Sequence, residues 1–172
     1  FFVTWFHKNG RQFSWRKQGV SPFGLLVAEL LLRQTRAQMV QEVWPGLRRA
    51  YPTPQKLARA RPDVLCKRVE CLGLQDQRVV ALKTVASELV ERFGGRVPEE
   101  QEDLLSLSHV GIYTAAAVRV FAFGHQEPVL DANVVRVLSR ITGVELGPDP
   151  RRDRRIGVLA RAILPEGKAR EH

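Results

Sequence analysis

The fold is decided by one stretch of sequence, Leu105-Ser106-Leu107-Ser108-His109-Val110-Gly111-Ile112-Tyr113-Thr114-Ala115-Ala116-Ala117-Val118. An apolar segment runs into a short turn that contains Gly111, and a segment of small residues begins directly after it. The first backbone N–H groups of a helix have no partner inside that helix, so a helix start here would offer a seat for phosphate. A plain helix–turn–helix corner fits the same residues equally well. The stretch therefore predicts two helices joined by a tight turn.

Helical signals continue outward from this stretch in both directions. Apolar residues recur at helical spacing in residues 22–34 and 75–93, and prolines stand at three expected helix starts. We expect helices at 22–34, 36–50, 54–60, 62–69, 75–93, 112–123, 131–142 and 153–163. Pro45 should break or kink the second of these. No alternating apolar run is bracketed by hairpin turns, so the predicted fold class is all-α.

Charge is the first indication of a partner. The chain of 172 residues has a formal net charge of +9, and most of the excess of Lys and Arg lies in residues 1–86. Residues 87–150 are acidic, and the tail from Arg151 is basic again. Clustered positive charge suits a polyanion, because neutralised phosphates release their counterions. A basic protein without a polyanionic partner remains the alternative, because charge alone does not distinguish the two.

Composition excludes several classes of protein. No apolar run reaches the length of about 20 residues that a membrane helix needs, so we expect no membrane contact. Residues 1–6 are apolar but too short for a signal peptide. Two cysteines, Cys66 and Cys71, cannot build a zinc or iron–sulfur site, and they indicate a reducing, cytoplasmic setting.

Several segments resemble the endonuclease III and MutY superfamily of helix-hairpin-helix DNA glycosylases. Residues 107–111 are similar to the family's Leu-Pro-Gly-Val-Gly, although His109 replaces the first glycine, and Thr114-Ala115 follows as Thr-Ala does there. Phe13-Ser14-Trp15-Arg16 resembles the Leu-Pro-Trp-Arg signature of MutY-type enzymes. Residues 28–35 resemble the catalytic helix, and residues 129–137 resemble the aspartate segment. These segments occur in the family's order and spacing over residues 10–145.

The resemblance implies two helical lobes with a cleft for DNA between them and with Glu29 and Asp131 at its floor. Residues 18–129 are then a six-helix barrel that contains the helix-hairpin-helix motif. Residues 1–17 and 130–172 form a terminal helical lobe that stops before an iron–sulfur segment. The family's [4Fe-4S] cluster is expected, with its cysteine ligands beyond residue 172 if it is present. The resemblance also implies that the protein is a monomer, that its partner is double-stranded DNA, and that it is associated with the nucleoid in the cytoplasm.

The same resemblance assigns catalytic roles. Glu29 lies among apolar neighbours, so by itself it either faces solvent or occupies a pocket that raises its pKa. The family match implies that Glu29 assists departure of the base, and that Asp131 stabilises the sugar cation. Asp131 is also a good N-cap, and Asn133, which matches a residue that holds the catalytic groups, is otherwise a polar residue of a first turn. Tyr113 occupies the position of the lysine that forms a Schiff base in bifunctional members, which implies a glycosylase without lyase activity.

Other residues are implied to bind DNA. Gln34, with Arg33 beside it, matches the residue that enters the base stack when a nucleotide is flipped out. Arg78 is a candidate phosphate contact, and the hairpin offers His109, Val110, Gly111 and Thr114. Each of the charged residues, taken singly, is equally an ordinary solvated side chain.

The base to be removed is the least determined property. Residues 71–78 lack the tyrosine pair of MutY-type adenine glycosylases and look more like the mismatch enzymes that remove thymine or uracil opposite guanine. We therefore favour thymine or uracil opposite guanine, with adenine opposite guanine or oxidised guanine as the alternative. A non-catalytic helix-hairpin-helix module that only binds DNA is the alternative of another class.

Overall fold

The computed structural model describes residues 2–145, 153–167 and 169, and these residues are helical with no strand among them. The predicted all-α class is therefore confirmed. The chain divides into two compact units, one of residues 11–123 and one of residues 1–10 with 124–172. The sequence predicts this division at residues 17/18 and 129/130. The first boundary differs because the 3₁₀ turn η1 (Ser14–Arg16) packs against helices of the larger unit.

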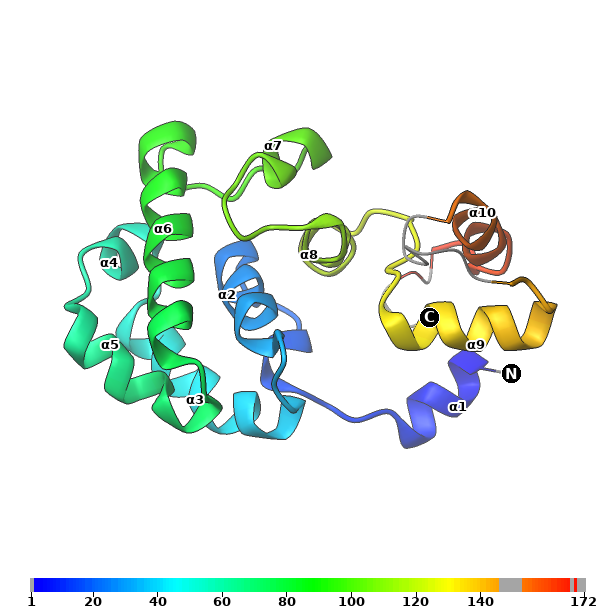
Figure 1. Cartoon of the computed structure of the whole chain (residues 1–172), viewed down its shortest axis with the longest axis horizontal. Helices are drawn as coiled ribbons and strands as arrows, with labels where there is room; N and C mark the ends of the chain where they lie inside the picture. The colour runs from blue at the N-terminus through cyan, green and yellow to red at the C-terminus, as the bar shows by residue number, and fades with distance from the viewer. Residues whose placement is uncertain (1, 146–152, 168, 170–172) are drawn as a thin grey trace. The chain divides into compact units, whose positions relative to one another are not determined.

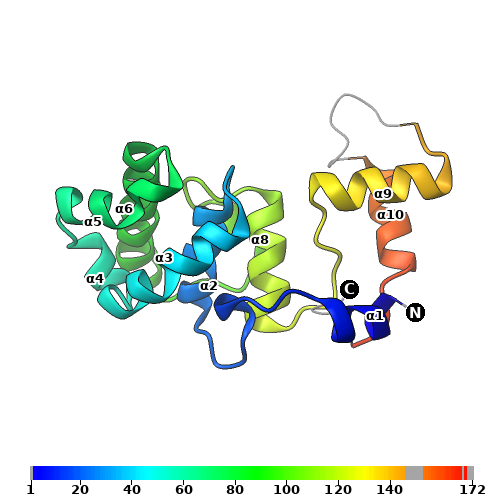
Figure 2. The ribbon, with the colours of Figure 1, turned by 90° about the horizontal axis from the view of Figure 1, so that it is seen from below.

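The larger unit is organised around helix α2 (Pro22–Leu32), which lies beside α3 (Ala37–Ala50), α6 (Gln75–Phe93) and α8 (Ile112–Val118) (Figures 1 and 2). Ser21 caps the start of α2 by accepting a hydrogen bond from the backbone N–H of Gly24, and Pro22 follows it. Every residue from Phe23 to Leu31 is buried, so this helix has no solvent face to fill with polar side chains. A carboxylate on α2 is therefore held inside the protein.

Shorter elements complete this unit. They are α4 (Pro54–Ala58), α5 (Pro62–Val69), the 3₁₀ turn η2 (Glu70–Leu72), α7 (Gln101–Leu105) and a π-helical turn η3 (Arg119–Phe123). Glu102 and Asp103 lie in the first turn of α7, where acidic residues favour a helix start. No helix among the described residues is long and apolar enough to span a membrane.

Three expectations about helix bounds need correction. The helix predicted at 22–34 ends at Leu32, because Gln34 adopts a left-handed conformation with φ 54°. Pro45 does not break α3, which continues through it to Ala50. The helix predicted at 112–123 changes to π-helical geometry at Arg119.

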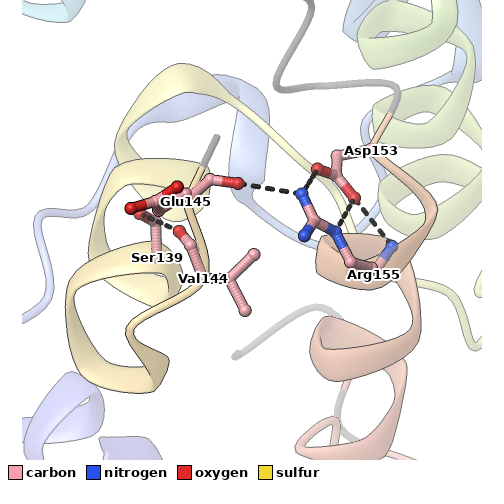
Figure 3. Close-up of polar contacts among 5 residues, drawn as sticks. All are labelled: Ser139, Val144, Glu145, Asp153 and Arg155. Atoms are coloured by element: carbon pink, nitrogen blue, oxygen red, sulfur yellow. Dashed lines mark hydrogen bonds and ion pairs between the residues drawn. The ribbon is translucent and has the colours of Figure 1, made fainter. Parts of the chain in front are cut away.

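The smaller unit contains α1 (Phe2–Asn9), α9 (Ala132–Thr142) and α10 (Arg154–Ala162). Its core is formed by Val135 and Leu138 of α9 with Ile156 and Ala160 of α10. Polar contacts hold the ends of these two helices (Figure 3). Arg155 donates to the carboxylate of Asp153 and, at 2.8 Å, to the backbone carbonyl of Glu145, while Ser139 donates to the carbonyl of Val144.

Candidate active site

The larger unit contains one buried carboxylate, Glu29, among the residues that the structure describes. Glu29 is 1% exposed, and the guanidinium of Arg16 donates a hydrogen bond from Nη2 to Glu29 Oε1 at 2.9 Å. Arg16 lies over the ring of Phe121, with its guanidinium carbon 3.4 Å from the ring centroid. The arginine is thus fixed between an aromatic face and the carboxylate, which is a favourable place for a planar cation.

Burial raises the pKa of Glu29 above its ordinary value. The charge of Arg16 and hydrogen bonds from Tyr113 and Arg16 act in the opposite direction, but desolvation is the larger effect. A carboxyl group in this state exchanges a proton closer to neutral pH than a surface glutamate does. Of the two placements that the sequence allowed for Glu29, the structure therefore has the buried one.

Two polar atoms at this site have no hydrogen-bond partner. They are Oε2 of Glu29 and Nη1 of Arg16, both buried. One is an acceptor and the other a donor, and an unpaired buried polar atom costs about 1–3 kcal/mol. Buried polar atoms without a partner in the protein are uncommon, and catalytic groups are among the exceptions.

Asp131 and Asn133 lie in the smaller unit, at the start of α9. The Oδ1 atom of Asp131 accepts backbone hydrogen bonds from Asn133 at 2.8 Å and Val134 at 2.7 Å, so the predicted N-cap is present. The amide of Asn133 donates to Asp131 Oδ2 at 3.1 Å, and its carbonyl oxygen accepts from Arg136. Both oxygens of the Asp131 carboxylate are therefore held in a fixed orientation.

The hairpin consists of α7, the turn of residues 106–111 and α8. His109 stands at the position where the family has glycine, and it adopts φ 60°, which is the left-handed conformation that this position requires. No side chain caps the start of α8 at Gly111, so its first N–H groups are available to a ligand. The side chains of Val110 and Thr114 are buried, which leaves the backbone and exposed His109 as the groups that can contact DNA.

Three non-glycine residues with positive φ line one open pocket of about 460 Å³ in the larger unit. They are Gln34 with φ 54°, Leu74 with φ 52° and His109 with φ 60°. The three come from three separate loops, and Leu74 is an apolar side chain that is 48% exposed. Left-handed conformations of such residues are unfavourable and concentrate at functional sites. Arg33, which also lines this pocket, donates to the carbonyl of His109 at 3.4 Å.

Arg78 does not lie where a phosphate contact requires. Its side chain is only 6% exposed, and Nε and Nη1 donate to the carbonyls of Gly73 at 2.7 Å and Leu31 at 2.8 Å. Its Nη2 atom donates to the carbonyls of Arg33 and Leu72 and to the hydroxyl of Thr35. Arg78 therefore joins the loop that carries Gln34 to the loop that carries Leu74, which corrects the expectation that it binds DNA directly.

The cysteines do not fit an iron–sulfur cluster. A [4Fe-4S] cluster takes four thiolates, and this chain has two cysteines, one half-buried (Cys66) and one exposed (Cys71). The described residues contain no group of three or more side chains that could bind a metal ion. Cys66 and Cys71 therefore do not form the site of the expected cluster, and the prediction that its ligands lie beyond residue 172 stays a prediction.

Three residues that the structure brings into these sites have no role predicted from the sequence. Arg16 was part of a quoted motif, but its pairing with Glu29 depends on the packing of η1 against α2. Leu74 follows a glycine in a loop, a signal that an exposed apolar residue stands at a turn. Glu88 of α6 accepts two hydrogen bonds from Ser108 in the hairpin turn, a contact that no local pattern predicts.

Known proteins share the helical fold and much of the sequence of this chain. A thymine/uracil-DNA glycosylase of Pyrobaculum aerophilum is 36% identical over 165 residues, which cover 95% of this chain and 71% of that protein. An adenine DNA glycosylase of Mycobacterium tuberculosis is 37% identical over 138 residues, which cover 80% and 45% of the two chains. The solved structure of a thermostable thymine-DNA glycosylase superposes with a TM-score of 0.86 at 30% identity, and covers 99% of this chain and 78% of that one.

Residues 27–158 match the HhH-GPD superfamily of base excision DNA repair proteins. The match includes the buried glutamate of α2, the hairpin and the start of α9. It spans most of the chain, and the relatives above extend the likeness to nearly its whole length. The chain belongs to the HhH-GPD superfamily of base excision DNA repair proteins.

Proposed function

We propose that this chain is the catalytic core of a DNA glycosylase that hydrolyses the bond between deoxyribose and a mismatched thymine or uracil opposite guanine. The observation that carries the proposal is the buried Glu29, whose pKa is raised and whose carboxylate is paired with Arg16 and Tyr113. A pure DNA-binding module has no use for such a group, because a carboxylate near phosphates weakens binding.

The chemistry follows from the protonation state of Glu29. A protonated carboxyl donates its proton to the departing base, so the electron pair of the breaking N-glycosidic bond leaves on a neutral base. The sugar passes through an oxocarbenium-like state, as in glycoside hydrolysis, and water adds at C1′. After it has given up the proton, the Glu29 carboxylate accepts one from the attacking water, and Arg16 stabilises that charged form.

Asp131 serves as the carboxylate that stabilises the positive sugar. Its orientation is fixed by two backbone N–H groups and by the amide of Asn133, as described above. A group that is held before the reaction contributes more than one that has to reorient as charge develops. Asn133 acts through Asp131 in this scheme and is a positioning residue.

Tyr113 makes the enzyme monofunctional. A phenol cannot form the imine with the sugar that strand cleavage through a Schiff base requires, whereas an amine can. The Tyr113 hydroxyl instead bonds to the Glu29 carboxylate. The product is an abasic site in an intact strand.

The hairpin and the 460 Å³ pocket form the DNA-binding surface of the larger unit. Backbone N–H groups at the hairpin turn bind phosphate without reading sequence, and Arg33 adds a positive charge beside them. Gln34 and Leu74 enter the duplex where the target nucleotide leaves it, Gln34 with a polar group and Leu74 with an apolar one. Chromosomal DNA as substrate places the action of the protein in the cytoplasm at the nucleoid.

The preference for thymine or uracil rests on two observations. Residues 71–78 lack the tyrosine pair of the adenine enzymes. The thymine/uracil glycosylase of Pyrobaculum aerophilum is 36% identical over 95% of this chain, whereas an adenine glycosylase that aligns with 97% of the chain is 32% identical. The adenine enzyme remains the second candidate.

The deciding experiment is single-turnover base release by the full-length protein from duplexes that contain T·G, U·G, or adenine opposite oxidised guanine. Alkali reveals abasic sites, and borohydride added without alkali traps any imine. Glu29→Gln should lower the rate by roughly 10²–10⁴-fold while duplex binding is kept. Glu42→Gln, an exposed glutamate on the neighbouring helix α3, is the matched control and should leave the rate unchanged.

Each outcome assigns the function. Release of thymine or uracil, without a trapped adduct, supports the proposal. Release of adenine alone makes the protein an adenine glycosylase, and a trapped adduct contradicts the role given to Tyr113. Tight binding without release from any duplex favours the non-catalytic module.

A further inference from the structure

Two side chains of helix α6 form hydrogen bonds to the hairpin turn. The carboxylate of Glu88 accepts two hydrogen bonds from Ser108, one from its backbone N–H at 2.7 Å and one from its hydroxyl at 2.5 Å. One helical turn later on α6, Arg92 donates to the carbonyl of Ser106 at 3.0 Å and to its hydroxyl at 2.6 Å. Residues four apart lie on the same face of a helix, so α6 presents both side chains to the turn.

The residues of the turn explain why such bonds are needed. Ser108 stands where the family pattern has proline, and it has a free φ rotation and a backbone N–H that proline lacks. His109 stands where the pattern has glycine, and it is held at φ 60°, a conformation that is unfavourable for any residue with a Cβ atom. The turn therefore lacks the proline that would restrict its φ and the glycine that would adopt a left-handed conformation without strain.

The charge of Glu88 is a second argument. A carboxylate next to a phosphate-binding turn repels DNA, so electrostatics alone disfavours an acidic residue at this position. Glu88 is half-buried, and both of its oxygens are occupied by Ser108. A negative charge kept in that place has to contribute something that outweighs the repulsion.

We propose that Glu88 is a positioning residue for DNA binding, which fixes Ser108 and with it the left-handed turn at His109 in place of a proline. The proposal rests on the DNA-binding role given to the hairpin above. Arg92 supports the same turn at Ser106, and Arg33 supports it at the carbonyl of His109. Glu88 itself touches no substrate and acts through the turn.

The direction in which Glu88→Ala changes the affinity for duplex DNA tests this inference. If Glu88 were only a surface charge, Glu88→Ala would remove repulsion and the protein would bind duplex DNA more tightly. If Glu88 positions the turn, the same variant loses two hydrogen bonds and should bind a short non-specific duplex about tenfold more weakly. The milder Glu88→Gln keeps an acceptor oxygen for the Ser108 N–H and should lie between Glu88→Ala and the parent. Glu91→Ala, an exposed glutamate on the same helix, is the matched control for the charge.

Rescue by proline separates positioning from general stability. Ser108→Pro removes the N–H and the hydroxyl that Glu88 binds and restricts φ by covalent geometry. The double variant Glu88→Ala with Ser108→Pro should return duplex affinity to within about threefold of the parent, because the rigid residue replaces the lost bonds. Affinity by fluorescence anisotropy and single-turnover base release at saturating enzyme are measured together, and the loss in Glu88→Ala should fall on affinity.

Several outcomes would overturn the proposal. Tighter or unchanged binding by Glu88→Ala refutes it, and so does a double variant that binds no better than Glu88→Ala alone. If Glu88→Ala does not fold, Glu88→Gln and its double variant with Ser108→Pro decide by the same criteria. Failure of the proposed function is distinct, since it is an absence of base release from the parent protein while duplex affinity still responds to Glu88 and to proline.

Discussion

Replacement of Arg78 by methionine is the most informative perturbation of the larger unit. The side chain of Arg78 is 6% exposed and its guanidinium donates to carbonyls of two separate loops. Methionine fills a similar volume with no donor, so the variant removes the hydrogen bonds and leaves little cavity. Burial holds the charge of Arg78 away from water and lowers its pKa, and the hydrogen bonds to the carbonyls offset this cost.

The size of the effect follows from the two shortest carbonyl contacts, to Gly73 at 2.7 Å and Leu31 at 2.8 Å. A hydrogen bond from a charged group contributes about 1.5–3 kcal/mol, and the carbonyl of the buried Leu31 would be left without a partner. The expected loss in the free energy of unfolding is therefore about 3–5 kcal/mol, which is within the range for breaking a buried charged contact. Arg78→Lys keeps the charge but donates from a single atom that cannot span both loops, and it should lose about 1–3 kcal/mol.

Urea unfolding followed by circular dichroism measures both losses, and duplex binding measures their consequence. Because Arg78 joins the loops of Gln34 and Leu74, we expect base release to fall in Arg78→Lys even where the protein is fully folded. The reasoning is refuted if Arg78→Met loses less than about 1 kcal/mol of unfolding free energy, because so small a loss is usual for substitutions at the surface. It is also refuted if folded Arg78→Lys releases base at the parent rate, since the two loops would then be held by other contacts.

Three further predictions concern single residues. Because burial raises the pKa of Glu29, the folded protein binds a proton that the unfolded chain has lost, so stability should fall as pH rises from the ordinary value of 4.5 to the raised one. The unfolding free energy of Glu29→Gln relative to the parent should therefore rise over that pH window. Base release by the parent should decline over the same window as Glu29 loses its proton. An unfolding free energy that depends on pH equally in both proteins would contradict this. His109→Gly should stabilise the fold by about 0.5–1 kcal/mol in thermal unfolding, because relief of the left-handed strain exceeds the added entropy of the unfolded chain; a loss would mean that the imidazole makes a stabilising contact. Leu74→Ser, at a position 48% exposed, should change stability by less than about 0.5 kcal/mol. It should slow base release from a stacked duplex by about tenfold while release from a single strand is unchanged, and equal slowing on both substrates would exclude a role in base flipping.

Much of the fold was predictable because the signals are local. Prolines and a serine N-cap mark where α2, α4 and α5 begin, and these starts agree with the structure. Helix ends were less predictable, because the end of α2 depends on Arg78, which lies more than 40 residues away in sequence. The helix α1 (Phe2–Asn9) was not predicted at all, since eight residues carry too little periodicity to distinguish a helix from an extended terminus.

The candidate site divides in the same way. Glu29, Tyr113 and Asp131 could be named from motif positions, and the contacts that orient Asp131 are local, whereas the contact that pairs Glu29 with Arg16 comes from another segment. Nothing in the sequence near Glu29 indicates that Arg16 pairs with it, because the pair forms only when η1 packs against α2. A candidate residue was therefore identifiable from sequence, but its pKa direction and its orientation were properties of the packed structure.

The three left-handed residues suggest why this surface needs support from elsewhere in the fold. Gln34, Leu74 and His109 each adopt a conformation that costs about 1–2 kcal/mol in a free chain, so each loop would relax if nothing held it. Arg78 donates to the carbonyl of Arg33 and to the hydroxyl of Thr35, on either side of Gln34, and to the carbonyl of Gly73 just before Leu74. Glu88 accepts from Ser108 and Arg33 donates to the carbonyl of His109, so both hold the turn at His109. Gln34, Leu74 and His109, which we propose to contact DNA, are exposed and strained, whereas Arg78 and Glu88, which hold their loops, are buried or half-buried on α6. Substitutions of these α6 residues should therefore weaken DNA binding without touching DNA, and they should do so in proportion to the strain that they release.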